Sequence, residues 1–235
     1  GTYTGSGPHV IDFNGKGIWL YASDGPTVTH IDGEDERRVV FCNSNETEET
    51  IIEGFTITNG QASQGGGIYC NNSSPSFINC IIENNSVNAN GDGTFSFGGG
   101  IFSYESNPSF TDCLIQNNQI NSVGYRGGAG IYCTYSNLNL TGCLIKNNSF
   151  LGLGANDFGG GIRASFSNID MSECEISEHY SSIGSGISIF ATSISLTNTA
   201  IEDNIAYFNG GGLHCDSASS ANISGCSFLG NFALG

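Results

Sequence analysis

The nine cysteines are the residues with the widest choice of chemistry in this sequence. Five of them recur at regular intervals, with Thr199 at the place where the series is interrupted: Cys80, Cys113, Cys143, Cys174 and Cys226. Buried thiols can serve as small apolar side chains, and in an oxidising compartment they can form disulfides. Three repeats contain a second cysteine and so allow the pairs Cys70–Cys80, Cys133–Cys143 and Cys215–Cys226. The odd total leaves at least one thiol free, and no Cys or His pair has zinc-finger spacing, so we expect no metal.

Carboxylates are the second group that could do chemistry. They gather at Asp32–Glu36 and Glu46–Glu49, but neither segment has EF-hand spacing or the nonapeptide calcium repeat. We therefore interpret both as solvated turns. Arg163 is the one basic residue in its column of the repeat, and none of its column neighbours is acidic. Acid–base catalysis needs acidic and basic side chains that converge on one place, and the repeat columns do not supply them. The sequence therefore favours a protein without an active site or a cofactor, while leaving enzymatic activity open.

The composition explains which elements could hold these residues. The net charge is −16, which disfavours nucleic acids and anionic lipids as partners. Glycine accounts for 35 of the 235 residues and charged residues for only 12%. β-Branched residues, aromatics, Asn and Gly dominate over helix formers, a balance that predicts an all-β fold of short strands and tight turns. No apolar run approaches the roughly 18 residues of a membrane-spanning helix.

A repeat organises the chain. Six runs of small residues, each followed by Ile or Leu, mark it: 65–68, 98–101, 128–131, 159–162, 184–187 and 210–213. Each repeat reads as three short alternating strands, with Ile68, Phe77 and Ile82 pointing inward in the first complete copy. The residue before each recurring cysteine is mostly Gly, Asn or Asp, which tolerate a left-handed corner. We therefore predict a parallel β-helix of about seven to eight three-strand coils, with opening coils over 1–50 and regular repeats over 51–235.

The paired motifs, a Gly-Gly-x-Ile element and an apolar-x-x-Asn element such as Phe228–Asn231, resemble the repeats of chlamydial polymorphic outer membrane proteins. Related bacterial right-handed β-helix surface proteins share these motifs. The resemblance covers the chain from about Ile52 onward, and it implies a right-handed β-helix that is secreted or lies at the cell surface.

Stacking turns each repeat position into a ladder. The Asn of the second motif recurs, with His179 in one copy, at Asn85, Asn118, Asn148, Asn204 and Asn231. We interpret this ladder and the cysteine ladder as structural. Exposed aliphatics at Ile81, Leu114 and Leu144 would need a cover. We expect the long loops to fold over them, and a partner surface is the alternative. The apolar loop residues that would form this cover are Phe95, Phe97, Tyr125, Phe150, Leu151 and Phe158.

An outward aromatic column offers the clearest candidate binding site. It contains Tyr69, Phe102, Tyr132 and Arg163, with Tyr104 two residues beyond Phe102. Flat aromatic stripes can stack against sugar rings, although stacked aromatics also stabilise sheets without any ligand.

Two functions follow from these features. The first is a non-catalytic extracellular or cell-surface protein acting as an adhesin, a stalk or a filament subunit. Its partners would be further coils or other copies stacked end to end, since we expect the solenoid to continue beyond the last coil, and glycans or a neighbouring cell surface. The second is a polysaccharide-binding or pectate-lyase-like degrading protein that uses the aromatic column.

Overall fold

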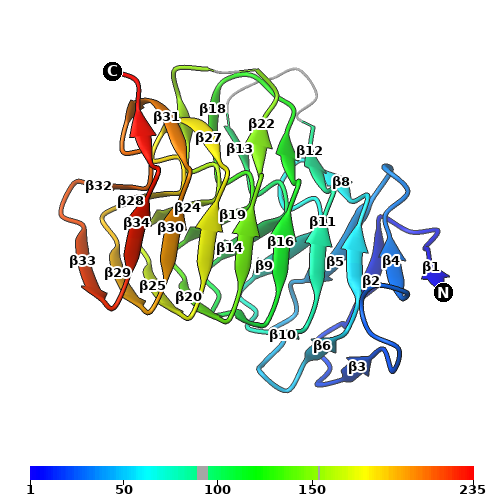
Figure 1. The fold of residues 1–235 in the computed structure, drawn as a ribbon. Helices are drawn as coiled ribbons and strands as arrows, with labels where there is room; N and C mark the ends of the chain where they lie inside the picture. Colours follow the sequence, from blue (N-terminus) through cyan, green and yellow to red (C-terminus); the bar gives the residue numbers. More distant parts are fainter. Residues whose placement is uncertain (89–94, 153) are drawn as a thin grey trace.

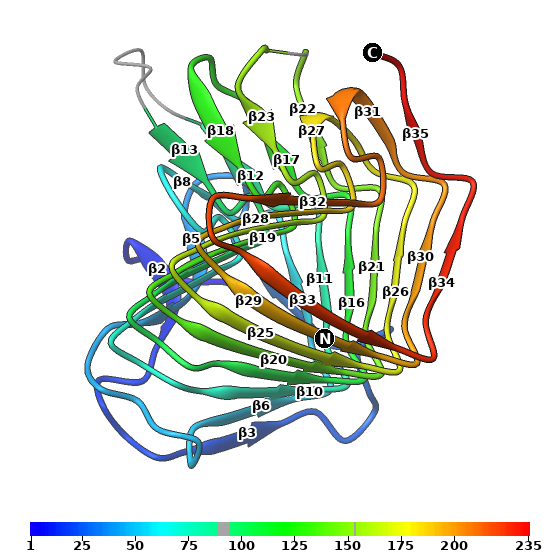
Figure 2. The same cartoon turned by 90° about the vertical axis from the view of Figure 1, so that its left-hand side faces the viewer.

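The computed structural model describes residues 1–88, 95–152 and 154–235. The described chain forms a right-handed parallel β-helix of about eight turns with no helix among its elements. Figure 1 shows the coils stacked from the N-terminus to the C-terminus. Viewed along the stack, three main sheets enclose a triangular core and a fourth rises from one corner (Figure 2). The predicted all-β fold with three main strands per coil is confirmed.

Sheet A contains nine parallel strands, and its outer face carries the predicted aliphatic stripe. Its strands are β1 (Thr2–Tyr3), β4 (His30–Asp32), β7 (Thr56–Thr58), β11 (Ile81–Glu83), β16 (Leu114–Gln116), β21 (Leu144–Lys146), β26 (Glu175–Ser177), β30 (Ala200–Glu202) and β34 (Ser227–Leu229).

Sheet B contains eight parallel strands, and the last six of them come directly after the glycine runs in the sequence. Its strands are β2 (His9–Asp12), β5 (Arg38–Cys42), β9 (Ile68–Asn71), β14 (Ile101–Tyr104), β19 (Ile131–Thr134), β24 (Ile162–Ser165), β28 (Ile187–Phe190) and β32 (Leu213–Asp216).

Sheet C also contains eight parallel strands, which lengthen from three residues to five toward the C-terminus. Its strands are β3 (Trp19–Tyr21), β6 (Ile51–Glu53), β10 (Ser76–Ile78), β15 (Ser109–Thr111), β20 (Asn137–Thr141), β25 (Asn168–Ser172), β29 (Ser193–Thr197) and β33 (Ser220–Ser224).

Sheet D, which the repeat pattern did not predict, combines short strands after the Asn corners with strands from the long loops. Its strands are β8 (Gln61–Ala62), β12 (Ser86–Val87), β13 (Phe95–Phe97), β17 (Gln119–Ile120), β18 (Tyr125–Gly127), β22 (Ser149–Phe150), β23 (Asp157–Phe158), β27 (Tyr180–Ile183), β31 (Ile205–Asn209) and β35 (Phe232–Ala233).

The core consists of stacked inward columns. Ile68 is paired with Ile101, which is paired with Ile131, and all three are fully buried. Phe77 and Phe110 stack with their ring centroids 4.9 Å apart. The predicted corners have left-handed backbones, with φ of 48° at Asn79. A β-strand rung therefore repeats the same side chain about every 4.8 Å, and the apolar columns fuse into one core.

The Asn ladder runs inside the corner between sheets A and D. Asn118 Nδ2 donates to Asn148 Oδ1 (2.9 Å) and to the Ile82 carbonyl (2.9 Å). Asn118 Oδ1 accepts from the backbone N–H and from Nδ2 of Asn85. Each fully buried amide thus satisfies backbone groups that the turn leaves without strand partners.

The cysteine ladder runs along the corner between sheets C and A, and all nine thiols are free. Four members, Cys80, Cys113, Cys143 and Cys174, are buried, whereas Cys226 is half-buried. Their thiols donate to backbone carbonyls, as Cys80 does to Ile78 at 3.3 Å. Cys70 lies in register with Cys42 of the preceding coil on sheet B, whereas Cys80 lies at the corner between sheets C and A. Burial raises the pKa of Cys133 to about 12, which keeps that thiol protonated.

The long loops do not lie where we expected them. Phe97, Tyr125 and Phe158 pack against the aromatic column of sheet B, and Phe97 stacks on Tyr132 with ring centroids 4.0 Å apart. The stripe of Ile81, Leu114 and Leu144 remains half-exposed on sheet A. The prediction was wrong because β13, β18 and β23 pair with one another as an extension of sheet D, which directs the loops toward sheet B. Residues 89–94 of the first loop lie outside the described residues.

Candidate functional site

The structure brings four of the five predicted aromatic-face residues into one column on sheet B. Tyr69, Phe102, Tyr132 and Arg163 occupy equivalent positions on β9, β14, β19 and β24. The ring centroids of Phe102 lie 5.1 Å from Tyr69 and 5.6 Å from Tyr132. Tyr104 lies at the end of β14, apart from this column, where it contacts Tyr135 edge-on.

The loop strands cover the centre of this column. Phe102, Tyr132 and Arg163 are only 5%, 8% and 4% exposed, respectively. Burial raises the pKa of Tyr132 to about 12. A sugar ring cannot stack on side chains that Phe97 and its neighbours already cover, so only the half-exposed Tyr69 and Tyr104 stay accessible.

Arg163 takes part in this cover. Its Nη1 donates to Ser188 Oγ (2.7 Å) and its Nη2 to the Tyr125 hydroxyl (3.3 Å). The guanidinium also lies 4.8 Å from the Phe158 ring centroid, within cation–π range. Arg163 therefore connects the sheet B column to two strands of the loops.

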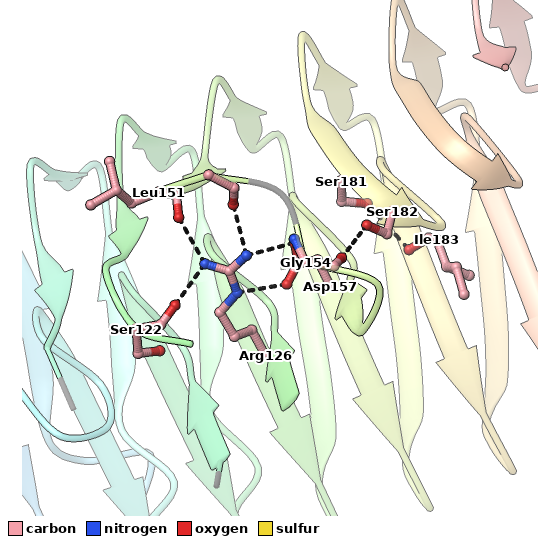
Figure 3. A network of polar contacts seen from close by, with 9 residues as sticks. Ser122, Arg126, Leu151, Gly154, Asp157, Ser181, Ser182 and Ile183 are labelled. Carbon is pink, nitrogen blue, oxygen red and sulfur yellow. Dashed lines mark hydrogen bonds and ion pairs between the residues drawn. The ribbon is translucent and has the colours of Figure 1, made fainter. Parts of the chain in front are cut away.

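A buried ion pair holds the loops in place, and our reading of the sequence missed it. Arg126 Nε and Nη2 donate to the Asp157 carboxylate at 2.6 and 2.7 Å (Figure 3). The remaining guanidinium hydrogens go to the carbonyls of Ser122, Leu151 and Gly152. Asp157 is fully buried and Arg126 is 3% exposed, so the pair is shielded from solvent. Neither residue belongs to the repeat, so no spacing in the sequence indicated their contact.

The open surface lies on sheet C instead. A groove of about 470 Å³ runs across its four longest strands, β20, β25, β29 and β33. The outward side chains that line it come from alternate positions of each strand: Asn137, Asn139, Asn168, Asp170, Ser193, Ser195, Ser220 and Asn222. A second hollow of about 620 Å³ lies next to it and shares Asn139. We call the residues lining the first hollow the sheet C groove.

The rows of the groove are ordered by their own hydrogen bonds. Asn168 Nδ2 donates to Asn137 Oδ1 at 2.7 Å, and Asn137 Nδ2 in turn donates to Asn107 Oδ1. Ser220 Oγ donates to Ser193 Oγ at 3.1 Å. Amides and hydroxyls both donate and accept, so an ordered array of them suits a ligand rich in hydroxyl groups. The alternation Asn137-x-Asn139-x-Thr141 was visible in the sequence, but we had not interpreted it as a site.

The charge of the groove restricts its ligands further. Among the described residues that line it, Asp170 is the one ionisable residue, and none is a lysine or an arginine. Together with the net charge of −16, this carboxylate repels anionic ligands.

Within residues 1–88, 95–152 and 154–235, no group of three or more His, Cys, Asp or Glu is placed to hold a metal ion. The described chain also contains no helix of the length and apolarity that crossing a membrane requires.

The comparison with protein families gives one match, to the model described as a right handed beta helix region, over residues 7–235. The chain belongs to the right-handed β-helix region family. No curated protein and no solved structure matched the chain. The family membership agrees with the fold and is common to β-helices of different functions, so the finer resemblance to chlamydial polymorphic outer membrane proteins stays a prediction.

Proposed function

We propose that this member of the family is an extracellular or cell-surface binding protein that holds an extended, uncharged glycan on the sheet C groove. The observation that carries the proposal is the ordered array of outward amides and hydroxyls across β20, β25, β29 and β33. In-register strands repeat these groups about every 4.8 Å along the helix axis. A polymer with regularly spaced hydroxyl groups can bind to several rungs at once, whereas a small polar ligand can bind to only one or two.

The setting of the groove supports an adhesin-like role. The outer face of sheet C around the groove is rich in Asn and Ser and poor in charged residues. The resemblance of the repeats to those of chlamydial surface proteins points to the cell exterior. The binding site differs from the aromatic column that the sequence suggested, because that column is covered between Phe102 and Arg163. The groove therefore replaces the column as the surface on which we place the glycan.

The experiment compares binding of the purified chain to immobilised neutral and acidic polysaccharides. Replacing Asn139, Asp170 and Asn222 together by Ala removes hydrogen-bonding groups worth about 1 kcal/mol each. We expect this triple variant to bind the neutral glycan about 100-fold more weakly. The matched control is Glu83→Ala with Gln116→Ala, which removes a hydrogen-bonded outward pair from sheet A.

The outcomes separate the alternatives. Equal loss of binding in the sheet A control, or no binding of wild type to any polysaccharide, would contradict the proposal. Release of new reducing ends from the polysaccharide would show that the protein cleaves its ligand, as the pectate-lyase-like alternative requires. A preference for acidic polysaccharides would also contradict it, because the described residues that line the groove include no cationic group to receive them.

A further inference from the structure

Two exposed aromatic residues occupy backbone positions that aromatic side chains normally avoid. Tyr135 and Phe166 follow β19 and β24 at the corner between sheets B and C, and both are left-handed, with φ of 51° and 50°. The equivalent corner of an earlier coil holds Asn72, with φ of 51°, and a later coil holds Ala191. The fold therefore accepts other residues at this corner, and Asn is among the few side chains that suit a left-handed backbone.

The left-handed backbone at these two positions costs stability, and the rings that occupy them are only half-buried. A left-handed backbone costs roughly 1–2 kcal/mol for a residue with a Cβ atom, and a bulky residue there is a clear outlier. Tyr135 and Phe166 nevertheless stay 55% and 49% exposed. Strain at exposed positions that the fold does not require is a reason to look for a function.

The two rings form an ordered stack with parallel planes. Their centroids lie 5.2 Å apart and their planes differ by only 7°. Tyr104 extends the row edge-on from one side at 6.1 Å, and Phe190 does so from the other at 5.4 Å. We call these four residues the aromatic rail. It runs along the helix axis, because its members come from four successive coils.

The rail borders the sheet C groove. Tyr135 precedes Asn137 by two residues and Phe166 precedes Asn168 by two, and both Asn residues line the groove. An aromatic row thus lies beside a parallel row of amides, in the same direction and with the same repeat. Sugar rings have apolar C–H faces and polar hydroxyl edges, so such a pair of rows can receive both parts of one chain.

We propose that the aromatic rail is the stacking platform for a neutral hexopyranose polymer whose chain runs parallel to the helix axis. The inference rests on the proposed function and specifies its substrate class. All-equatorial β-linked polymers expose the flattest C–H faces and are the best match to the exposed parts of the parallel rings of Tyr135 and Phe166. Uronic acid polymers are excluded by the carboxylate of Asp170 and by the absence of basic residues among those lining the groove.

The test uses Asn, the residue found at this corner in the coil of Asn72. Tyr135→Asn and Phe166→Asn, separately and together, are titrated with cellohexaose, mannohexaose and an oligogalacturonate in a calorimeter, and their thermal unfolding is measured by circular dichroism. We expect the double variant to bind the best neutral hexasaccharide at least tenfold more weakly. We also expect its unfolding temperature to equal or exceed that of wild type, because Asn relieves the left-handed strain.

Two further variants complete the design. Tyr135→Phe keeps the ring and should bind like wild type, whereas Tyr180→Asn removes a ring that is 42% exposed on sheet D and should not change binding. Wild-type affinity in the double Asn variant would overturn the rail, as would a fall in its unfolding temperature, which would show that the rings serve stability. If the rail fails while the sheet C triple variant still loses binding, the proposed function stands. If wild type binds none of the neutral hexasaccharides and none of the polysaccharides, both fail.

Discussion

His179 makes the stability of this β-helix depend on pH in a way that one substitution can remove. It replaces Asn in the buried ladder and is only 1% exposed. Its Nδ1 lies 2.9 Å from Asn204 Oδ1, which also accepts the His179 backbone N–H. Since this oxygen only accepts, Nδ1 carries the proton of the neutral ring, and Nε2 accepts from Asn148 Nδ2 at 3.2 Å. Protonation at Nε2 would bring two donors face to face.

The magnitude follows from the pKa. Burial lowers the pKa of His179 from 6.5 to about 4, although the hydrogen bond to Asn204 raises it in part. The unfolded chain therefore takes up a proton at a higher pH than the folded chain does. The contribution of the neutral ring is fully present above pH 6.5, falls as the pH drops from 6.5 toward 4, and levels off below 4. At about 1.4 kcal/mol per pKa unit, the loss amounts to about 3 kcal/mol.

The assay measures urea unfolding of wild type and His179→Asn by circular dichroism between pH 8 and pH 3.5. Asn restores the residue that the ladder uses at 118, 148 and 204, and it does not titrate. The carboxylates of the chain titrate in both proteins, so their effects cancel in the difference. We expect the free energy of unfolding of wild type, minus that of the variant, to fall by about 3 kcal/mol across this range. A difference that stays constant with pH would refute the hydrogen-bonding scheme, and so would a folded-state NMR titration of His179 near pH 6.5.

Three further predictions test the ladders and the loops. Asn118→Ala should lower the free energy of unfolding by about 3 kcal/mol or more, because it leaves the buried partners of four hydrogen bonds unsatisfied. In the same denaturation experiment, Asn137→Ala at an exposed position should cost less than about 1 kcal/mol. Asp157→Asn should leave the Arg126 charge buried without its counter-ion and lower the free energy of opening the loops by about 3 kcal/mol. Hydrogen exchange at Tyr125–Gly127 would report this opening, and the pKa of Tyr132 should fall from about 12 toward its ordinary value. A thiol reagent should modify Cys215 in the native protein, leave the seven buried thiols unmodified, and count nine thiols in urea; a lower count would show disulfides.

The inward half of the fold could be predicted from the sequence because stacking imposes the same environment on each copy. Ile68, Phe77 and Ile82 were assigned to the core from alternation alone, and all three are fully buried. The corner before each recurring cysteine was assigned from Gly, Asn and Asp, and the backbone is left-handed there, as at Asn79 and Gly142. Such assignments are dependable in a solenoid, because each position of the repeat occurs in several coils and the same residue types recur there.

Sheet D was not predictable from the same pattern. Its repeat-derived strands, such as β12 and β17, contain only two residues, which is too short for alternation to be recognised. The loop strands β13, β18 and β23 come from segments of different lengths, and they pair only because the coils beneath them hold them at one spacing. Arg126 and Asp157 meet for that reason, although 31 residues separate them.

Alternation predicts the direction of a side chain and not its exposure, and this difference decides where function is to be sought in the chain. Tyr132 points outward as predicted, yet Phe97 covers it, so a column that looked like a binding face serves to anchor the loops. A better guide is a residue whose type is unfavourable for the backbone conformation that it adopts. Tyr135 and Phe166 stand at a left-handed corner where another coil uses Asn72, and both stay about half-exposed there. A left-handed backbone under a half-exposed aromatic residue is therefore the observation on which we base the proposed ligand site.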